Sequence, residues 1–512
     1  MARSSISRFQ QVLNKRLFRA LLGFTLLGLL LTGTTLMADS TDRGRALTRP
    51  ILKTVNEGIV KLKDLTPLAP QYTFNPQPLP EELKIVPPLK GNGPRKISRE
   101  QAIDKLYRMG HYNWLDYIDS LDDDNLAPLT KEAQRWIYEW QNPDPSECHT
   151  KKFLISNGTE KGFGLGAHLH KQGHLMTLAR ETGRIYILAP TGHYDDQYAF
   201  SDPCPDPHDP TRTITSTDCI TQPVSSCGIQ HATPENSIAT MIHWETDLDG
   251  KHFDPQTISP YWEKRLDEHF KGQKLSRAFY KIWWRGQSAA YLSRLNAKAS
   301  DAILSLRMEP RLHTKTMVYH DPVTNTDTPF NLTTNTTATP EARVPYPLPP
   351  NTINLHVRHG DKGGEMSLIP LQSYLDVVDT YSRHNPYRQF KRIFVSSEDP
   401  QVISDARTHA LTQSHPPTSP ITEPTRNWEV YTSHIQRIDS GPFQQMEKYG
   451  RTNMTMQWYL QLWMGLECDG WVGTRGSNWN RIIDEFRCIY VDKCQLPYWE
   501  VGPEKDWVGY FW

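Results

Sequence analysis

The chain has 512 residues, with 57 basic and 57 acidic side chains and therefore no formal net charge at pH 7. A balanced charge provides no broad basic face, which argues against nucleic acid as a partner. The 15 tryptophans and 22 tyrosines are more than an ordinary core requires, and they fit small molecules or glycans because sugar rings stack on aromatic faces. Ordinary packing explains any single ring equally well.

The N-terminus combines a basic segment with an apolar one. Five basic residues, the last of them Arg19, precede an uncharged apolar stretch from Ala20 to Ala38. At ~1.5 Å per residue this stretch just spans a bilayer core, and the basic flank favours a cytoplasmic N-terminus. We therefore predict a cytoplasmic tail (1–19), a type II single-pass anchor (20–38) and a lumenal remainder in a thin secretory membrane such as the Golgi. A signal peptide cleaved near Ala38 is the alternative.

The cysteines and glycosylation sequons agree with a lumenal location. Because the chain has seven cysteines, at least one is unpaired or bridges to another chain, and the absence of a CxxC pair argues against a zinc site. Sequons occur at Asn157, Asn331, Asn335 and Asn453.

A proline-rich stem is predicted after the anchor, within residues 39–140. Prolines crowd the segment from Pro67 to Pro94, which shows little apolar periodicity and reads as extended chain. Two helices are predicted next. Ser98 with Gln101 three residues later, and Thr130 ahead of 131–140, both resemble N-terminal capping signals.

Two regions then repeat a pattern of strand, loop and helix. In the first (141–345), we predict a βαβ unit with strands at 152–155 and 184–188, a glycine-rich loop at 157–166 and a helix at 168–180. A Ser/Thr/Pro-rich connector (314–350) leads to the second region (346–512). There we predict strands at 353–357, 392–395 and 471–472 and helices at 371–383, 401–411 and 479–486. Two α/β regions with loops at the carboxyl ends of their strands place a ligand in the crevice between them.

Three loops compete for this ligand. The run from Arg358 to Glu365 holds cations, carboxylates and three glycines, which suits a diphosphate leaving group and the removal of a proton, although a solvated turn is the alternative. Gly162, Gly164 and Gly166 precede a helix whose amides can cradle an anion or simply permit close packing. The loop 473–478, with Arg475 and Arg481, is a second such site. The alternating glycines do not match GxGxxG, so NAD is not expected.

Four motifs in order resemble those of one enzyme family. The segment INLHVRHGDKGGE (Ile353–Glu365) resembles the donor-binding motif HVRRTDK…E of the α1,6-fucosyltransferases that act on N-glycan cores and chitin oligosaccharides. Gln141–Pro143 with Cys148 resembles the QNP…C entry to that catalytic domain. Lys161–His170 is similar to its KGxGxGxxLH loop, and Trp283–Arg294 resembles its WxxxQxxxYLxR helix.

The resemblance covers roughly 141–490 and implies an inverting, metal-independent glycosyltransferase of the GT-B type, with two Rossmann-like domains facing a cleft. It implies GDP-fucose as the donor, no cofactor, and GlcNAc of an N-glycan core (α1,6-linkage) or a related oligosaccharide or glycoprotein as the acceptor. Glu365 corresponds to the general base, supported by Arg358 and Lys362. The implied donor-binding residues are His356, Arg358, His359, Asp361, Tyr374, Glu398, Asp399, Ser477, Asn478 and Arg481.

The sequence also departs from the family. His359 stands where the family has a second arginine, and Gln461 replaces an acid. A histidine carries little charge at neutral pH but gains it in an acidic lumen. The stem lacks heptad periodicity, so coiled-coil dimerisation is not implied and the oligomeric state stays open.

Three other functions compete with this prediction. A protein O-fucosyltransferase differs only in its acceptor. A metal-dependent GT-A transferase would use a DxD site at Asp122–Asp124 or Asp247–Asp249, and chelator sensitivity would separate it. A non-catalytic Golgi glycan-binding protein would retain the fold without turnover.

Overall fold

The fold is taken from a computed structural model of the chain. The residues it describes are 97–121, 127, 129–156, 164–188, 200–240, 246–248, 251–253, 258–271, 277–308, 317–321, 326–330, 344–360, 363, 366–384, 390–413, 428–438, 441–474, 476–494 and 496–502. The predicted tail, anchor and most of the stem lie outside these residues. Across the described ranges, no helix combines the length and apolar character needed to cross a bilayer.

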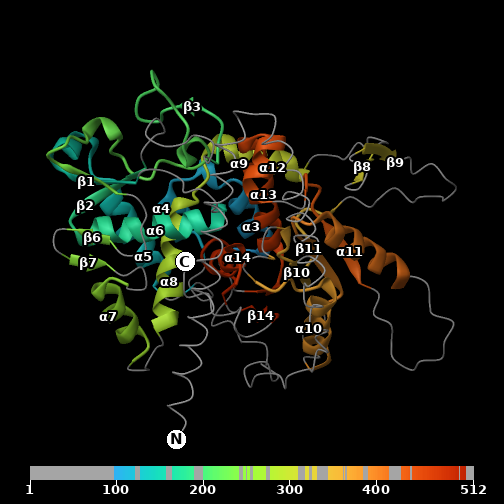
Figure 1. The fold of residues 1–512 in the computed structure, drawn as a ribbon. Helices are drawn as coiled ribbons and strands as arrows, with labels where there is room; N and C mark the ends of the chain where they lie inside the picture. Colours follow the sequence, from blue (N-terminus) through green and yellow to red (C-terminus); the bar gives the residue numbers. More distant parts are fainter. Residues whose placement is uncertain are drawn as a thin grey trace, which may run out of the picture. The chain divides into compact units, whose positions relative to one another are not determined.

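The first α/β region is built on a three-stranded parallel sheet in the order β2-β1-β5 (Figure 1). β1 (Lys152–Ser156), α6 (Leu165–Glu181) and β2 (Arg184–Leu188) confirm the predicted βαβ unit. β5 (Ser237–Thr240) adds a parallel strand on the other side of β1, and the prediction had missed it.

The second region is a five-stranded parallel sheet in the order β12-β11-β10-β13-β14. Its strands are β10 (Thr352–His356), β11 (Arg392–Ser396), β12 (Glu429–Thr432), β13 (Gly470–Gly473) and β14 (Tyr498–Glu500). The chain order across the sheet is thus third, second, first, fourth, fifth, which matches the first five positions of the Rossmann order 3-2-1-4-5-6. The strand order reverses between β10 and β13. The mixed α/β class with parallel sheets is confirmed, whereas β12 and β14 were not predicted.

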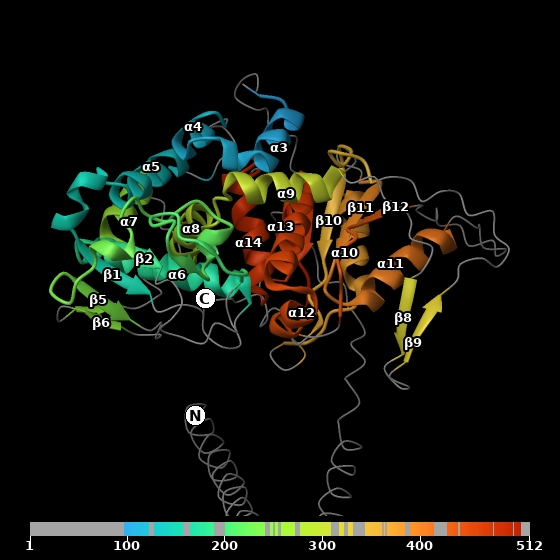
Figure 2. The ribbon, with the colours of Figure 1, turned by 90° about the horizontal axis from the view of Figure 1, so that it is seen from above.

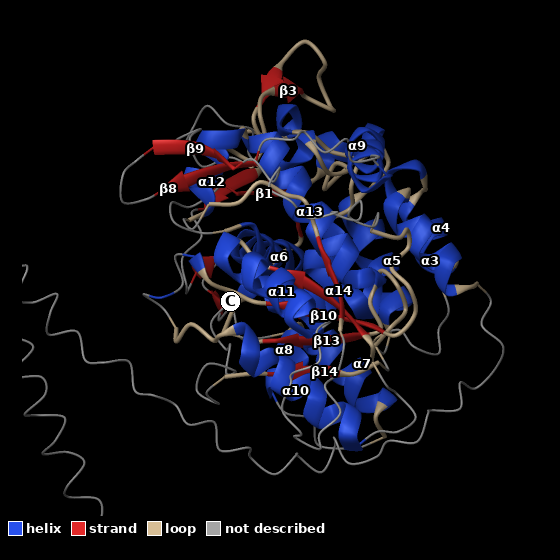
Figure 3. Cartoon of the chain, turned by 90° about the vertical axis from the view of Figure 1, so that its right-hand side faces the viewer, coloured by secondary structure: helices blue, strands red, loops and turns tan. Residues whose placement is uncertain are grey.

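Helices cover both faces of this second sheet (Figure 3). Phe394 of β11 joins the large core that includes α13, while its neighbours Ile393 and Val395 join the core beneath α10. Strands buried on both faces often read as continuous apolar runs, as β11 does in Ile393–Val395, whereas β10 has polar residues at alternate positions. The helices of this region are α10 (Leu371–His384), α11 (Pro400–Gln413), α12 (Pro442–Tyr449), α13 (Arg451–Glu467) and α14 (Asn478–Ile489).

Helices also join the two sheets. α6, α8 and α14 pack against one another, so the first sheet's helix meets a helix of the second region (Figure 2). The remaining helices of four or more residues are α3 (Arg99–Tyr107), α4 (Trp114–Asp119), α5 (Thr130–Gln141), a 3-10 segment (Pro145–Thr150), α7 (Pro260–His269), α8 (Arg277–Leu292) and α9 (Ala297–Met308). The small antiparallel pairs are β3 (Cys204–Pro205) with β4 (Thr213–Ile214), β6 (Thr246–Leu248) with β7 (Lys251–Phe253), and β8 (Met317–Asp321) with β9 (Thr326–Phe330).

The two predicted helix caps had different outcomes. Ser98 and Gln101 form the expected reciprocal pair, in which each backbone N–H donates to the other side chain. Thr130 is not the cap, because it is already the first helical residue and Leu129 precedes it. The Thr130 hydroxyl instead accepts a hydrogen bond from Gln287 Nε2 of α8 at 3.0 Å. The hydroxyl that the sequence pattern predicts as a helix cap is therefore used in a tertiary contact.

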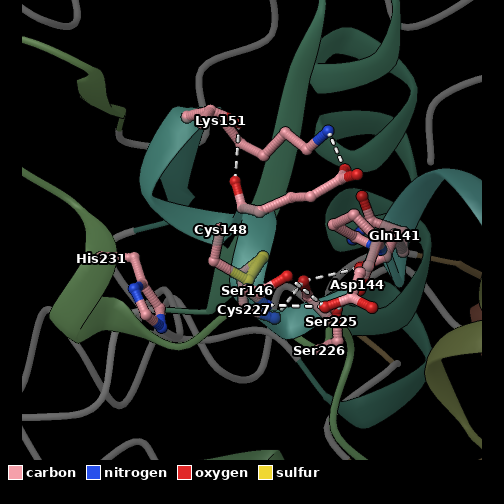
Figure 4. Close-up of a disulfide and its surroundings, with 12 residues drawn as sticks. Gln141, Asp144, Ser146, Cys148, Lys151, Ser225, Ser226, Cys227 and His231 are labelled. Atoms are coloured by element: carbon pink, nitrogen blue, oxygen red, sulfur yellow. Dashed lines mark hydrogen bonds and ion pairs between the residues drawn. A yellow bond between two sulfur atoms is a disulfide. The ribbon is translucent and has the colours of Figure 1, made fainter.

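Three disulfides form, and Cys468 is a buried free thiol, which agrees with the odd cysteine count. The pairs are Cys148–Cys227, Cys204–Cys219 and Cys488–Cys494. Figure 4 shows the first of these beside Ser225, whose hydroxyl donates to the Gln141 carbonyl at 2.7 Å. This bridge ties the 3-10 segment that follows α5 to a residue 79 positions further along the chain.

A buried ion pair holds three helices together beside the second sheet. Arg307 of α9 donates from Nε and Nη2 to Glu467 Oε1 and Oε2 at 2.8 and 2.9 Å, and both side chains are almost fully buried. The Tyr107 hydroxyl of α3 donates to the same carboxylate at 2.6 Å. Removing one partner of such a pair leaves an uncompensated buried charge.

We predict that Glu467→Ala lowers the free energy of unfolding by about 3–5 kcal/mol, because the Arg307 guanidinium stays buried without its counter-ion. Urea unfolding with the disulfides intact measures this change. The control is Glu139→Ala, which removes an exposed carboxylate 4.0 Å from Arg135 and should change stability little. A Glu467→Ala protein as stable as the control would contradict the role of the ion pair.

Candidate functional site

The parallel ladder between β10 and β11 sets the geometry of the site. Each residue of β10 lies opposite the residue 40 positions later in β11. Beyond the strand ends, residues 40 positions apart still face each other and form two side-chain ion pairs. Arg358 Nη1 lies 3.2 Å from Glu398 Oε1, and His359 Nδ1 lies 2.8 Å from Asp399 Oδ2. The structure therefore brings four of the predicted donor-binding residues together at the carboxyl edge of the sheet.

His356 belongs to the same ladder and is the last residue of β10. Its Nδ1 lies 2.9 Å from Ser396 Oγ, and the residue is 1% exposed. Burial lowers the pKa of His356 to about 4, with the neighbouring Arg358 acting in the same direction and Glu398 opposing it. His356 is therefore a neutral hydrogen-bonding group at physiological pH and contributes no charge to the site.

The two ion pairs differ in how they carry charge. Burial raises the pKa of Glu398, but the Arg358 guanidinium, together with hydrogen bonds to the carboxylate, outweighs it, so the pKa lies below its usual range and the carboxylate is ionised. Burial likewise opposes protonation of His359, yet the hydrogen bond to Asp399 and the one to the Ile369 carbonyl raise its pKa above the ordinary value of 6.5. One pair is permanent and the other depends on pH.

Arg437 was not predicted and completes this edge of the sheet. It follows β12 and donates to the carbonyls of Ser397, Ser433 and Ile435 at 2.8, 2.8 and 2.9 Å. Its contact with Ser397 holds the residue directly before Glu398. Burial, with Arg407 nearby, lowers the pKa of Arg437 to about 9. A correct prediction of β12 would have placed Arg437 at the carboxyl edge of the sheet, but the sequence analysis did not predict that strand.

The switch point between β10 and β13 joins the ladder to α14. Asn480 Nδ2 of α14 donates to the His356 carbonyl at 3.5 Å. A Cβ atom on Gly473, at the end of β13, would lie 2.3 Å from Asn480 Oδ1, so only glycine allows this approach. Ser477 is the N-terminal cap residue of α14, and its side chain makes no capping bond. The N-terminus of α14, with its free backbone N–H groups, thus lies beside the end of β10.

A buried polar chain connects this helix start to the first α/β region. His170 of α6 lies with Nδ1 2.9 Å from Asn478 Oδ1 and with Nε2 2.9 Å from Glu485 Oε2. Arg285 Nε of α8 donates to the other oxygen of Glu485 at 2.7 Å, and Arg481 Nη1 donates to Asn478 Oδ1 at 3.0 Å. Asn478, a predicted site residue, is therefore positioned by His170 of the other region, and Arg481 donates to the same amide oxygen from its own helix.

The last residues of the predicted glycine-rich loop form the start of α6, which meets the same helix. A Cβ atom on Gly166 would lie 3.2 Å from the Asn478 carbonyl carbon, so the small residue permits α6 to approach α14 closely. Gly164 is the N-terminal cap of α6, and Gly162 lies outside the described residues. Tyr374 is fully buried in the core beneath α10 and contributes packing at this edge.

Several predicted residues lie outside the described part of the chain: Asp361, Lys362, Glu365, Arg475 and Asp122–Asp124. Among the residues that the structure does describe, no group of three or more His, Cys, Asp or Glu side chains could hold a metal ion.

Four buried polar atoms at this edge of the sheet have no hydrogen-bond partner among the described residues. They are His356 Nε2, Tyr374 Oη, Glu398 Oε2 and Ser477 Oγ. Buried polar groups in folded proteins are nearly always satisfied by protein or water, so these atoms can form hydrogen bonds with water or with a polar ligand. The edge supplies a permanent cation, a titratable cation, two carboxylates and a helix N-terminus.

Comparisons with known proteins give a weak signal. No protein-family model matches the chain, and no curated protein is significantly similar to it. Among solved structures, the chain is similar to the fucosyltransferase NodZ from Bradyrhizobium at 11% identity, with 65% of this chain and 92% of NodZ covered and a TM-score of 0.29. A structure of NodZ α-1,6-fucosyltransferase soaked with GDP-fucose is 11% identical, with 65% of this chain and 92% of NodZ covered and a TM-score of 0.30. A structure of the same enzyme co-crystallised with GDP is 13% identical, with 65% and 91% covered and a TM-score of 0.29. A TM-score of this size does not establish a shared site.

We predict that His356 makes stability depend on pH. Because its pKa is lowered to about 4 in the folded state, the unfolded chain binds the proton first, so stability falls as pH drops from 6.5 towards 4. His356→Gln should reduce that slope, by up to about 1.4 kcal/mol per pH unit. Chemical unfolding at a series of pH values measures it. His149→Gln, an exposed histidine, is the control, and equal slopes in the two variants would refute the assignment.

Proposed function

We propose that the protein is an inverting glycosyltransferase that transfers fucose from GDP-fucose to a GlcNAc residue of an N-glycan core, or to a related oligosaccharide. The observation that carries the proposal is the register-matched cluster of Arg358–Glu398 and His359–Asp399, which follows β10 and β11 beside the switch point of a Rossmann-like parallel sheet. Ligands of open α/β sheets bind in the crevice at that point, outside the carboxyl ends of the strands.

The cluster suits a nucleotide diphosphate. Departure of GDP places growing negative charge on the diphosphate, and a fixed guanidinium in a dry cleft stabilises that charge more than solvent does. Arg358 has this role in our proposal, since its planar fork matches phosphate oxygens and it is 9% exposed. The helix start at Ser477 adds backbone N–H groups, which favour anions.

The acceptor side of the reaction needs a base. A sugar hydroxyl attacks the anomeric carbon through an oxocarbenium-like state while a carboxylate takes the hydroxyl proton. We assign that role to Glu365, with Lys362 and Asp361 beside it in the sequence, on the strength of the motif. Glu398 and Asp399 are already paired with cations, so they serve the donor side instead.

Other functions remain as competing proposals. A protein O-fucosyltransferase would use the same donor cluster with a different acceptor. For the GT-A alternative, Asp247 is in the short strand β6 and Asp249 lies outside the described residues. The glycan-binding alternative predicts donor binding without release of GDP in the presence of an acceptor.

Incubation of the protein with a panel of GDP- and UDP-sugars and with N-glycan-core or chitin-oligosaccharide acceptors tests the proposal. We expect transfer with GDP-fucose alone, unchanged by a chelator. In the same assay Arg358→Ala should abolish transfer, and Arg358→Lys should retain a small part of it because the charge persists without the fork.

The matched control is Arg392→Ala, which removes an arginine paired with Glu429 at the opposite edge of the same strands. It should transfer at the wild-type rate. Circular dichroism confirms that each variant is folded. The proposed mechanism is wrong if folded Arg358→Ala turns over at the wild-type rate. It is also wrong if the protein transfers sugar from UDP-sugars and a chelator stops this transfer.

For Glu365→Gln we expect a large fall in kcat with donor affinity nearly unchanged, because the amide keeps the shape but cannot accept the proton. Steady-state kinetics together with GDP binding by calorimetry separate the two effects. A variant that loses GDP binding while retaining kcat would place Glu365 in the donor pocket instead.

A further inference from the structure

The His359 ring is held by two acceptors at once. Its Nδ1 lies 2.8 Å from Asp399 Oδ2, and its Nε2 lies 2.9 Å from the Ile369 carbonyl oxygen. A carbonyl oxygen can only accept a hydrogen bond, so Nε2 must carry a proton. The carboxylate of Asp399 also accepts, since its pKa is lowered by the hydrogen bond from His359. Both contacts are therefore made together only by the imidazolium.

A neutral ring would lose one contact in either tautomer. With the proton on Nε2, the lone pair of Nδ1 faces a carboxylate, and with the proton on Nδ1, the lone pair of Nε2 faces a carbonyl oxygen. Because both ring nitrogens are engaged inside the protein, His359 is not available to donate to a diphosphate in this arrangement. This differs from the direct donor contact that its position in the motif implies.

The imidazolium joins three parts of the fold. It follows β10, its Nε2 reaches Ile369 just before α10, and its Nδ1 reaches Asp399, which caps α11 by accepting from the Gln401 N–H at 2.7 Å. The backbone carbonyl of His359 in turn accepts from Arg358 Nη1 at 2.8 Å. The position of the His359 backbone therefore bears directly on the orientation of the Arg358 guanidinium.

We propose that His359 is a pH-dependent positioning residue: as an imidazolium between Asp399 and the Ile369 carbonyl it fixes the backbone that orients Arg358, and loss of its proton weakens binding of the nucleoside diphosphate. The proposal rests on the proposed function for the identity of the ligand. The orientation of the Arg358 guanidinium then depends on whether His359 is protonated. An arginine in place of His359 would stay charged and would remove this dependence on pH.

The charges around the ring give the direction of the effect. Burial disfavours the imidazolium, while Asp399 and, more weakly, Glu398 favour it, and the α10 side contributes the uncharged Ile369 carbonyl. The pKa of His359 is raised above 6.5 on balance. A raised folded-state pKa means that the stabilisation is complete below pH 6.5 and is lost as pH rises through the folded-state value. Donor binding should thus be strongest in a mildly acidic compartment.

Two measurements on the full-length protein test this inference. The first is a histidine Cε1–H NMR titration, with the His359 resonance identified by its loss in His359→Gln. We expect its midpoint above 6.5 in the wild type, and a lower midpoint in Asp399→Asn, which retains the capping group but removes the charge. A wild-type midpoint at or below 6.5 overturns the proposal without any reference to GDP.

The second measurement is the affinity for GDP from pH 5.5 to 8.5. In the wild type it should fall above the His359 midpoint, by at most about tenfold per pH unit since one proton is lost. His359→Gln should bind weakly with no such fall, and His359→Arg should also bind without it. The control His111→Gln removes an exposed histidine 2.7 Å from Asp301 and should keep the wild-type profile.

The outcomes are separable. If His359→Gln retains the wild-type pH profile, the coupling to Arg358 is wrong. If GDP binds at no pH although the His359 resonance titrates as expected, the proposed function fails and the donor coupling with it, while the imidazolium pair stands.

Discussion

The register of the parallel ladder between β10 and β11 is the constraint on which the site depends. A parallel pairing with an offset of 40 residues places each side chain that follows β10 opposite a defined side chain that follows β11. Arg358 meets Glu398 and His359 meets Asp399 because of that offset. A shift of one residue would point every side chain to the other face of the sheet and would separate both pairs. The apolar core that sets the register thus also sets the electrostatics.

At the buried junction between the two α/β regions, packing likewise fixes the positions of charged and polar side chains. His170, Glu485 and Arg285 come from three helices, and each is almost completely buried. Charges removed from water are tolerated only when they are paired and hydrogen-bonded, so this junction specifies one arrangement of α6, α8 and α14. Because Asn478 is part of the chain of contacts, the packing of one region determines the geometry of a residue proposed to bind the donor in the other.

The parts of the fold that were predicted share a local cause. β1, β2 and β11 hold short apolar runs, β10 is a short strand buried along its whole length, and the capping box at Ser98 is complete within four residues. β12 and β14 were missed because Glu429 and Glu500 lie at the ends of very short strands whose pairing depends on neighbours. Arg437 was missed with β12, since nothing adjacent in the sequence marks it as part of a sheet edge.

The sequence by itself determined which chemical groups follow the central strand: a guanidinium, an imidazole and the motif that resembles a fucosyltransferase donor site. It also determined the parallel α/β class, because buried runs alternated with amphipathic helices. Only the tertiary structure decided which carboxylate faces which cation, since the partners are 40 residues apart and meet through strand pairing. It also placed two acceptors, Asp399 and the Ile369 carbonyl, against the same His359 ring, and these two hydrogen bonds raise the pKa of His359 above its ordinary value.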